Sequence, residues 1–289
     1  MAKEPKRHHF IPQMILRHFA DADESLWFWR REMEATPPIT ISTKNLFVQK
    51  DLYTFVHADG TKDVALEKFF SKLEGVGGPF ITRLAAIVRD GKTPDLDAGA
   101  WSFWDQFFYY QLKRAPGAIA AYTEQMGFAA KVDTAVAQIR DIYVEDGSDP
   151  NEPGLAERVR KNAIVLAQRA APSPDVLAAF KALGLAIYRI TDPTKSFIIG
   201  DVPGAMARFR HPDNSLSRPT LFLPITWDIA LGQTVKPKGV EVIRVDREQI
   251  RRMNVATAAR SQVIAGKSGT LLRSLATGVA YAGVKLGTQ

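Results

Sequence analysis

The stretch of chain between Asp97 and Pro116 places large aromatic side chains at helical spacing. Trp101, Trp104 and Phe108 recur every three or four residues, so they share one face of a helix. Aspartate is a favoured cap at the start of a helix, and proline ends or kinks one. Because apolar periodicity is the main signature of a buried face, these rings predict a core helix rather than a surface on which bases stack.

Short strand-like runs surround this helix, and the rest of the chain is mostly helical in pattern. Asp59-Gly60 and residues 191–194 read as turns, and residues 75–78 are predicted to close a helix that restarts at Pro79. Asp246 is predicted to cap the last helix. We therefore expect an α+β fold, predominantly helical around a small, largely antiparallel sheet. It would form a single domain over residues 1–289, with a possible helical insertion at residues 118–185.

Composition excludes several classes of protein. The chain has no cysteine, so disulfides, thiolate nucleophiles and thiolate metal sites are ruled out, and a metal could only be held by histidine, carboxylates or water. No apolar stretch is long enough to span a bilayer, and no apolar segment of a signal peptide follows the basic start. These features predict a cytoplasmic protein with no membrane partner.

Positive charge gathers at the two ends of the chain. The net charge is +7, and a basic C-terminal region at residues 236–289 holds ten lysines or arginines against three acidic residues. A basic patch is the electrostatic feature expected of a protein that binds RNA or DNA, although a solvated cationic face is the commoner explanation for a modest excess.

Two of the five histidines of the chain are adjacent near its start, in the run Lys6-Arg7-His8-His9-Phe10-Ile11-Pro12. Because Pro12 suits the first turn of a helix, the imidazoles would lie near exposed amides that attract phosphate or carboxylate. Neighbouring residues of an extended segment point to opposite sides, so His8 and His9 are not expected to bind one ion together. One of them could act in acid–base chemistry while the other anchors the structure.

Several motifs, taken in order, resemble the bacterial family called domain of unknown function 4238. That family typically shows a His-His-aromatic-x-Pro-Gln start and a later Thr-Ser-Asp-Asn-Pro turn, for which this chain has Ile199-Gly200-Asp201-Val202-Pro203. The resemblance covers nearly the whole chain and implies a single domain and candidate positions, without an activity. It rests on residues 8–13, Leu16-Arg17-His18-Phe19, Lys44-Asn45, Asp51-Leu52-Tyr53, Gln111 with Arg114-Ala115-Pro116, residues 197–203 and Leu223-Pro224.

Carboxylates and a guanidinium are candidates to complete a site. Glu67 and Glu74 are seven residues apart on one helix face, and with Asp201 and an N-terminal histidine they could hold Mg²⁺ or Mn²⁺ through hard oxygen ligands. For Glu67 a solvated helix carboxylate is the favoured alternative. Gln111 and Arg114 are neighbours on a helix, and Arg114 could clamp a phosphodiester or pair with Asp201 or Glu74 inside the fold.

These candidates suggest a reaction, since the familiar nucleotide-binding, nucleophile-elbow, zincin and kinase motifs are absent. The leading hypothesis is a nucleic-acid phosphodiesterase, with or without a divalent ion, which would fit a toxin or phage-defence role. The alternatives are a non-catalytic nucleic-acid-binding or sensor protein, and a homo-oligomeric scaffold. Catalytic roles are predicted for His8, His9, Gln111 and Arg114, metal binding for Glu74 and Asp201, and substrate binding for Arg17, Arg251 and Asn254.

Overall fold

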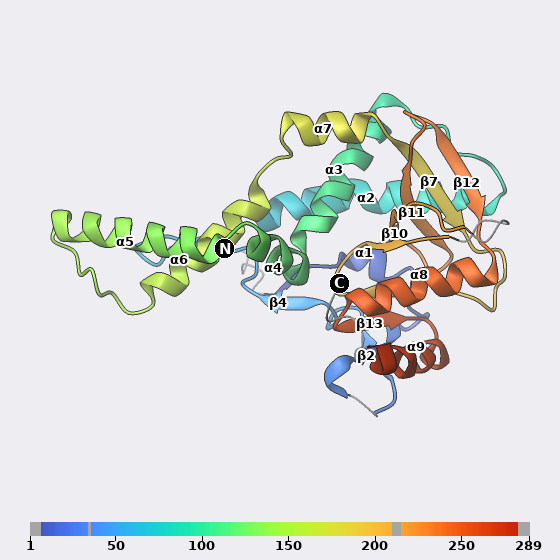
Figure 1. Ribbon diagram of the computed structural model, residues 1–289, viewed down its shortest axis with the longest axis horizontal. Helices are drawn as coiled ribbons and strands as arrows, with labels where there is room; N and C mark the ends of the chain where they lie inside the picture. Colours follow the sequence, from blue (N-terminus) through green and yellow to red (C-terminus); the bar gives the residue numbers. More distant parts are fainter. Residues whose placement is uncertain (1–6, 34–35, 210–214, 283–289) are drawn as a thin grey trace.

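The computed structural model describes residues 7–33, 36–209 and 215–282. Lys6 of the opening motif and residues 283–289 of the basic C-terminal region lie outside these ranges. Two larger sheets, two two-stranded sheets and a set of helices make up the described part (Figure 1). No helix within it is both long enough and apolar enough to traverse a bilayer.

The larger sheets draw their strands from distant parts of the chain. One has the order β12-β7-β11-β10-β9 and the other β3-β2-β13-β8, while β1 pairs with β4 and β5 with β6. The strands are β1 (Arg7–His9), β2 (Ser25–Arg30), β3 (Ile39–Ser42), β4 (Val48–Lys50), β5 (Phe55–Val56), β6 (Lys62–Asp63), β7 (Gly184–Arg189), β8 (Ile199–Gly200), β9 (Ala205–Ala207), β10 (Thr220–Pro224), β11 (Ile229–Thr234), β12 (Val240–Arg244) and β13 (Val263–Gly266).

The helices pack around these sheets, and two of them project as an arm at the left of Figure 1, namely α5 and α6. The arm falls inside the segment for which an insertion was predicted. The helices are α1 (Gln13–Leu16), α2 (Ala65–Arg89), α3 (Ala98–Arg114), α4 (Pro116–Gln125), α5 (Phe128–Asp146), α6 (Leu155–Arg169), α7 (Pro174–Lys181), α8 (Arg247–Arg260) and α9 (Gly269–Ala282), with a short 3-10 helix η1 (Arg31–Met33).

The structure confirms the α+β class and the largely antiparallel pairing. Among the strand pairs of the described residues, only β12 with β7 runs parallel. The strands form several sheets instead of one small sheet. The turn predicted at residues 191–194 does not join a hairpin, because β7 pairs with β11 and β12 while β8 pairs with β13. Such pairings join segments far apart in sequence, and local patterns do not encode them.

Helix α3 forms as its sequence predicts. The Asp97 side chain accepts a hydrogen bond from the amide of Ala100, and the helix ends at Arg114, before Pro116 opens α4. Trp104 and Phe108 are almost wholly buried in the main core cluster, which joins the N-terminal segment, α2 and the five-stranded sheet. Asp246 likewise caps α8, although a strand and α9 follow it.

Helix α2 is longer than predicted, because it runs through residues 75–78 and Pro79 without a break. A Cβ atom added at Gly77 would lie 2.7 Å from the terminal carbon of Met14. The glycine therefore serves a close approach of α1 to α2 rather than a helix end. Tertiary packing overrides the local helix-breaking signal here, and it keeps Glu67 and Glu74 on one continuous helix.

Candidate functional site

The two adjacent histidines point to opposite sides of β1, as predicted for an extended segment. His8 is fully buried, and its Nδ1 accepts a hydrogen bond of 3.0 Å from the backbone amide of Tyr53. Its ring stacks on the Tyr53 ring with centroids 5.5 Å apart. His8 therefore anchors the N-terminal segment to the core.

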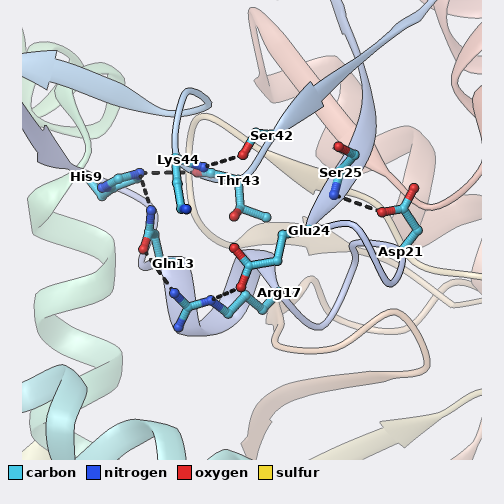
Figure 2. Close-up of polar contacts among 9 residues, drawn as sticks. All are labelled: His9, Gln13, Arg17, Asp21, Glu24, Ser25, Ser42, Thr43 and Lys44. Carbon is cyan, nitrogen blue, oxygen red and sulfur yellow. Dashed lines mark hydrogen bonds and ion pairs between the residues drawn. The ribbon is translucent and has the colours of Figure 1, made fainter.

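His9 is half-buried and faces a polar surface (Figure 2). Its Nε2 lies 3.2 Å from the carbonyl oxygen of Thr43 and 3.4 Å from Nε2 of Gln13. A carbonyl can only accept and an amide nitrogen can only donate, so Nε2 cannot serve both contacts. The shorter contact, with Thr43, assigns the proton of the neutral ring to Nε2, and Nδ1 then keeps a lone pair. Burial, helped by the charges of Arg114 and Arg7, lowers the pKa of His9 below 6.5, against the opposing effect of Glu74. His9 is therefore a neutral base near pH 7.

The short helix beside His9 does not supply the predicted anion site. α1 spans only Gln13–Leu16, with Pro12 as its cap. Four residues cannot build a useful helix dipole. Attraction of an anion must therefore come from side chains.

Three exposed cations lie on the segments next to His9. Arg7 precedes it in β1, Lys44 lies in the turn that supplies Thr43, and Arg17 donates a long hydrogen bond of 3.4 Å to Oε1 of Gln13. Figure 2 shows Gln13 between His9 and Arg17, and it shows Arg17 paired with Glu24 at 3.2 Å. Attraction between this cationic rim and an anionic ligand would be long-range and sensitive to salt.

The Arg114 side chain is buried in the core and contacts the backbone of His9. Its side chain is only 1% exposed and pairs with the Glu74 carboxylate at 2.8 Å. It also donates to the carbonyl oxygen of His9 at 2.6 Å and to the Tyr53 hydroxyl at 3.3 Å. Of the two predicted roles, the structural pairing with Glu74 is the one that forms. Arg114 therefore positions the His9 backbone and is not placed to clamp a phosphate.

Glu67 lies on the α2 face that carries Glu74, and burial raises its pKa to about 7, with Arg114 opposing the rise and Glu74 adding to it. Among the described residues its Oε2 atom has no hydrogen-bond partner, and neither has the side-chain amide of the fully buried Gln111. Buried polar atoms of this kind are uncommon and cluster at functional sites. The seven-residue spacing from Glu74 pointed to Glu67 as a possible site member, but a solvated carboxylate was favoured for it, and the structure instead places it partly buried.

The remaining predicted site residues lie outside the His9 cluster. Asp201 accepts from the backbone amide of Gln262, and its amide donates to the carbonyl of Val263. Burial raises the pKa of Asp201. Asn254 is buried and bridges the backbone of Ser196 and Ile198. The Asp201 and Asn254 side chains therefore connect backbone segments of the fold.

The predicted metal ligands do not converge. Glu74 is paired with Arg114, and Asp201 is hydrogen-bonded to the segment before β13. Across the residues that the structure describes, no group of three or more histidine, aspartate or glutamate side chains is placed to hold a metal ion. Each of the two carboxylates therefore already has a partner within the fold.

Together, these features define an α+β protein with a histidine, arginine and glutamate cluster between its N-terminal segment and α2 and α3. The chain matches the family described as "Protein of unknown function (DUF4238)" over residues 7–268, and it belongs to that family. The resemblance seen in the motifs is thus confirmed. The match contains the whole His9 cluster and ends just before α9. No curated protein and no solved structure matches the chain.

Replacing Glu67 with glutamine should stabilise the protein at high pH. The pKa of Glu67 is about 7 in the folded state against 4.5 for the free group, so the folded state binds more protons between these values. Stability from this group is therefore greatest below pH 4.5 and is lost as the pH rises towards 7. Allowing for screening of this partly exposed group, Glu67→Gln should add about 1–2 kcal/mol to the free energy of unfolding at pH 8.

Urea denaturation at pH 5 and pH 8 would measure this difference, which should nearly vanish at pH 5. Glu145→Gln, at an exposed position of the arm helix α5, is the matched control and should change stability by less than about 0.5 kcal/mol at both values. An equal effect of the two variants at pH 8 would show that Glu67 ionises normally.

Proposed function

We propose that the protein is a nucleic-acid phosphodiesterase and that His9 is its general base. The observation that carries the proposal is a half-buried imidazole, with Nε2 held by the Thr43 carbonyl, whose neighbouring segments carry three exposed cations. Arg7, Arg17 and Lys44 provide positive charge for the phosphodiester backbone. The fixed tautomer leaves Nδ1 of His9 as the atom that takes a proton.

RNA is the substrate that this site suits best. The 2′-hydroxyl of RNA is a nucleophile already present in the substrate, so a base and positive charge at the phosphate are enough for cleavage. In this step His9 Nδ1 takes the 2′-hydroxyl proton as the 2′-oxygen bonds to phosphorus. The bond from phosphorus to the 5′-oxygen breaks, and that oxygen takes a proton from solvent. Glu74, which raises the pKa of His9, stabilises the imidazolium that forms.

The test is incubation of the purified full chain with end-labelled RNA, single-stranded DNA and duplex DNA. Each would be incubated with Mg²⁺, with Mn²⁺ and with a chelator. Cleavage of RNA in the chelator, giving 2′,3′-cyclic phosphate ends, is the expected result. Cleavage that requires a divalent ion and includes DNA would contradict the metal-free route. No cleavage of any substrate would contradict the enzyme proposal itself.

A second candidate function is non-catalytic nucleic-acid binding through α8. A groove of about 470 Å³ lies between β9, the segment after it and α8. It combines apolar side chains with Arg208, Arg251 and Arg252, and Glu248 in the same lining pairs with Arg252. Binding here would weaken with salt, would survive loss of His9 and would fail in an Arg208→Gln, Arg251→Gln double variant.

A further inference from the structure

A cavity of about 640 Å³ lies at the other end of α3 from the His9 cluster. Its size is within the range of sites that hold small organic ligands. Trp101 and Arg114 are separated by 13 positions of α3, which is about 20 Å along the helix. The cavity is therefore a separate place in the fold, and the proposal for it does not depend on the phosphodiesterase proposal. Its wall comes from α3, α7 and the connection from β11 to β12.

A carboxylate stands in the part of this wall that α3 supplies, together with Trp101, Ser102 and Gln106. Asp105 is on the buried face of α3, its side chain is 10% exposed, and its nearest cation is Lys238 Nζ at 3.5 Å. That separation is an ion pair without a short hydrogen bond, so the partner offsets only part of the cost of burying the charge. Burial accordingly raises the pKa of Asp105, opposed by Lys238 and Lys181. A hydrogen-bond donor on a ligand would complete its environment.

Lys238 is held over the cavity by its backbone. It is one of the few non-glycine residues of the described chain with a positive φ, 53°, and its Nζ lies 4.6 Å from the centre of the Trp101 ring. The connection carrying it packs so closely on β7 that a Cβ at Gly184 would lie 2.2 Å from the carbonyl oxygen of Lys236. A strained backbone fixed in this way is typical of functional positions.

We propose that this cavity binds a small organic anion with an apolar body and one hydrogen-bond donor. The ammonium groups of Lys181 and Lys238 bind the anionic group, whether carboxylate, phosphate or sulfonate. Leu177 and Trp101 contact the apolar body. The carboxylate of Asp105 accepts from a hydroxyl or amine of the ligand. Two cations against one carboxylate leave the cavity with a net positive charge, which selects anions over neutral molecules of the same shape.

The probe 8-anilinonaphthalene-1-sulfonate has these three features, since it carries a sulfonate, an aromatic body and one N–H group. Fluorescence titration of the full chain should show one probe bound per chain. Lys238→Gln and Lys181→Gln should each weaken binding about fivefold, the loss expected for one partly screened charge pair. The neutral analogue N-phenyl-1-naphthylamine should bind more weakly to the wild type and equally to all variants.

Lys72→Gln, which removes an exposed lysine from α2 outside the cavity, is the matched control and should leave binding unchanged. Equal affinity in the wild type and both cavity variants would overturn the proposal, as would an equal loss in the Lys72→Gln control or several probes bound per chain. Near-ultraviolet circular dichroism would show whether each variant is folded. If Lys238→Gln does not fold, Lys181→Gln decides the result alone, because Lys181 is at the exposed end of α7.

Discussion

Replacing Arg114 with alanine should lower the free energy of unfolding by about 3–5 kcal/mol, the range for removing one partner of a buried ion pair. The guanidinium holds together groups from three segments, namely the His9 carbonyl on β1, the Tyr53 hydroxyl and the Glu74 carboxylate on α2. Without it, Glu74 loses the cation that balances its charge, and the carbonyl and hydroxyl lose a donor. Urea denaturation at pH 7 would measure the change.

The exposed pair between Arg252 and Glu248 on α8 provides the control. The two are 2.8 Å apart, the same separation as in the Arg114 pair, but their side chains are 27% and 56% exposed. Arg252→Ala should therefore lower stability by less than about 1 kcal/mol, because water screens the pair in both states. Should Arg114→Ala lower stability no more than Arg252→Ala, the buried pair would have no special role in holding the N-terminal segment.

Local sequence patterns were sufficient to predict those elements whose boundaries depend on one or two residues. Asp97 and Pro116 mark the limits of α3, and alternation in an extended segment separates His8 from His9. Helical spacing likewise placed Gln111 on the buried face that carries Arg114. In each case a single chemical property, such as a cap, a missing amide or a period, decides the local structure.

Features that depend on contacts between distant segments could not be predicted in this way. Helix α2 continues through residues 75–78, where its composition suggested an end. Gly77 leaves room there for the Met14 side chain of α1. The burial that raises the pKa of Glu67 depends on how α2 packs in the fold, and the spacing of Glu67 from Glu74 shows only that the two share a helix face. The sequence allowed Arg114 either to bind a phosphodiester or to pair with a carboxylate inside the fold. The position of Glu74 opposite its guanidinium selects the pairing.

The buried position of Arg114 changes which residues can act on a substrate. A guanidinium that is 1% exposed cannot bind a phosphodiester without unfolding its surroundings. The positive charge that a polyanion would meet must therefore come from Arg7, Arg17 and Lys44, while Arg114 fixes the backbone that carries His9. A buried ion pair behind a half-exposed base gives the site a rigid support on elements of secondary structure.

In the cleavage assay, replacing His9 with glutamine should lower the rate of RNA cleavage at least about a hundredfold, the usual contribution of a general base. Glutamine can still donate to the Thr43 carbonyl, and the His9 carbonyl that binds Arg114 belongs to the backbone, so the fold should persist. The pKa of His9 is lowered from 6.5 by burial, so the base form prevails above that pH. The wild-type rate should therefore rise with pH on the acid side of 6.5 and level off above it.

The control for this variant is His57→Gln, which replaces an exposed histidine in the turn between β5 and β6. It should leave both the rate and the pH profile of cleavage unchanged. If His9→Gln cleaves RNA as fast as His57→Gln, His9 is not the base. If the wild type cleaves but its rate does not fall below pH 6.5, the titrating group lies elsewhere. A neutral imidazole is needed because only its unprotonated nitrogen can take the hydroxyl proton, so loss of the side chain and loss of its base form should lower the rate through the same step.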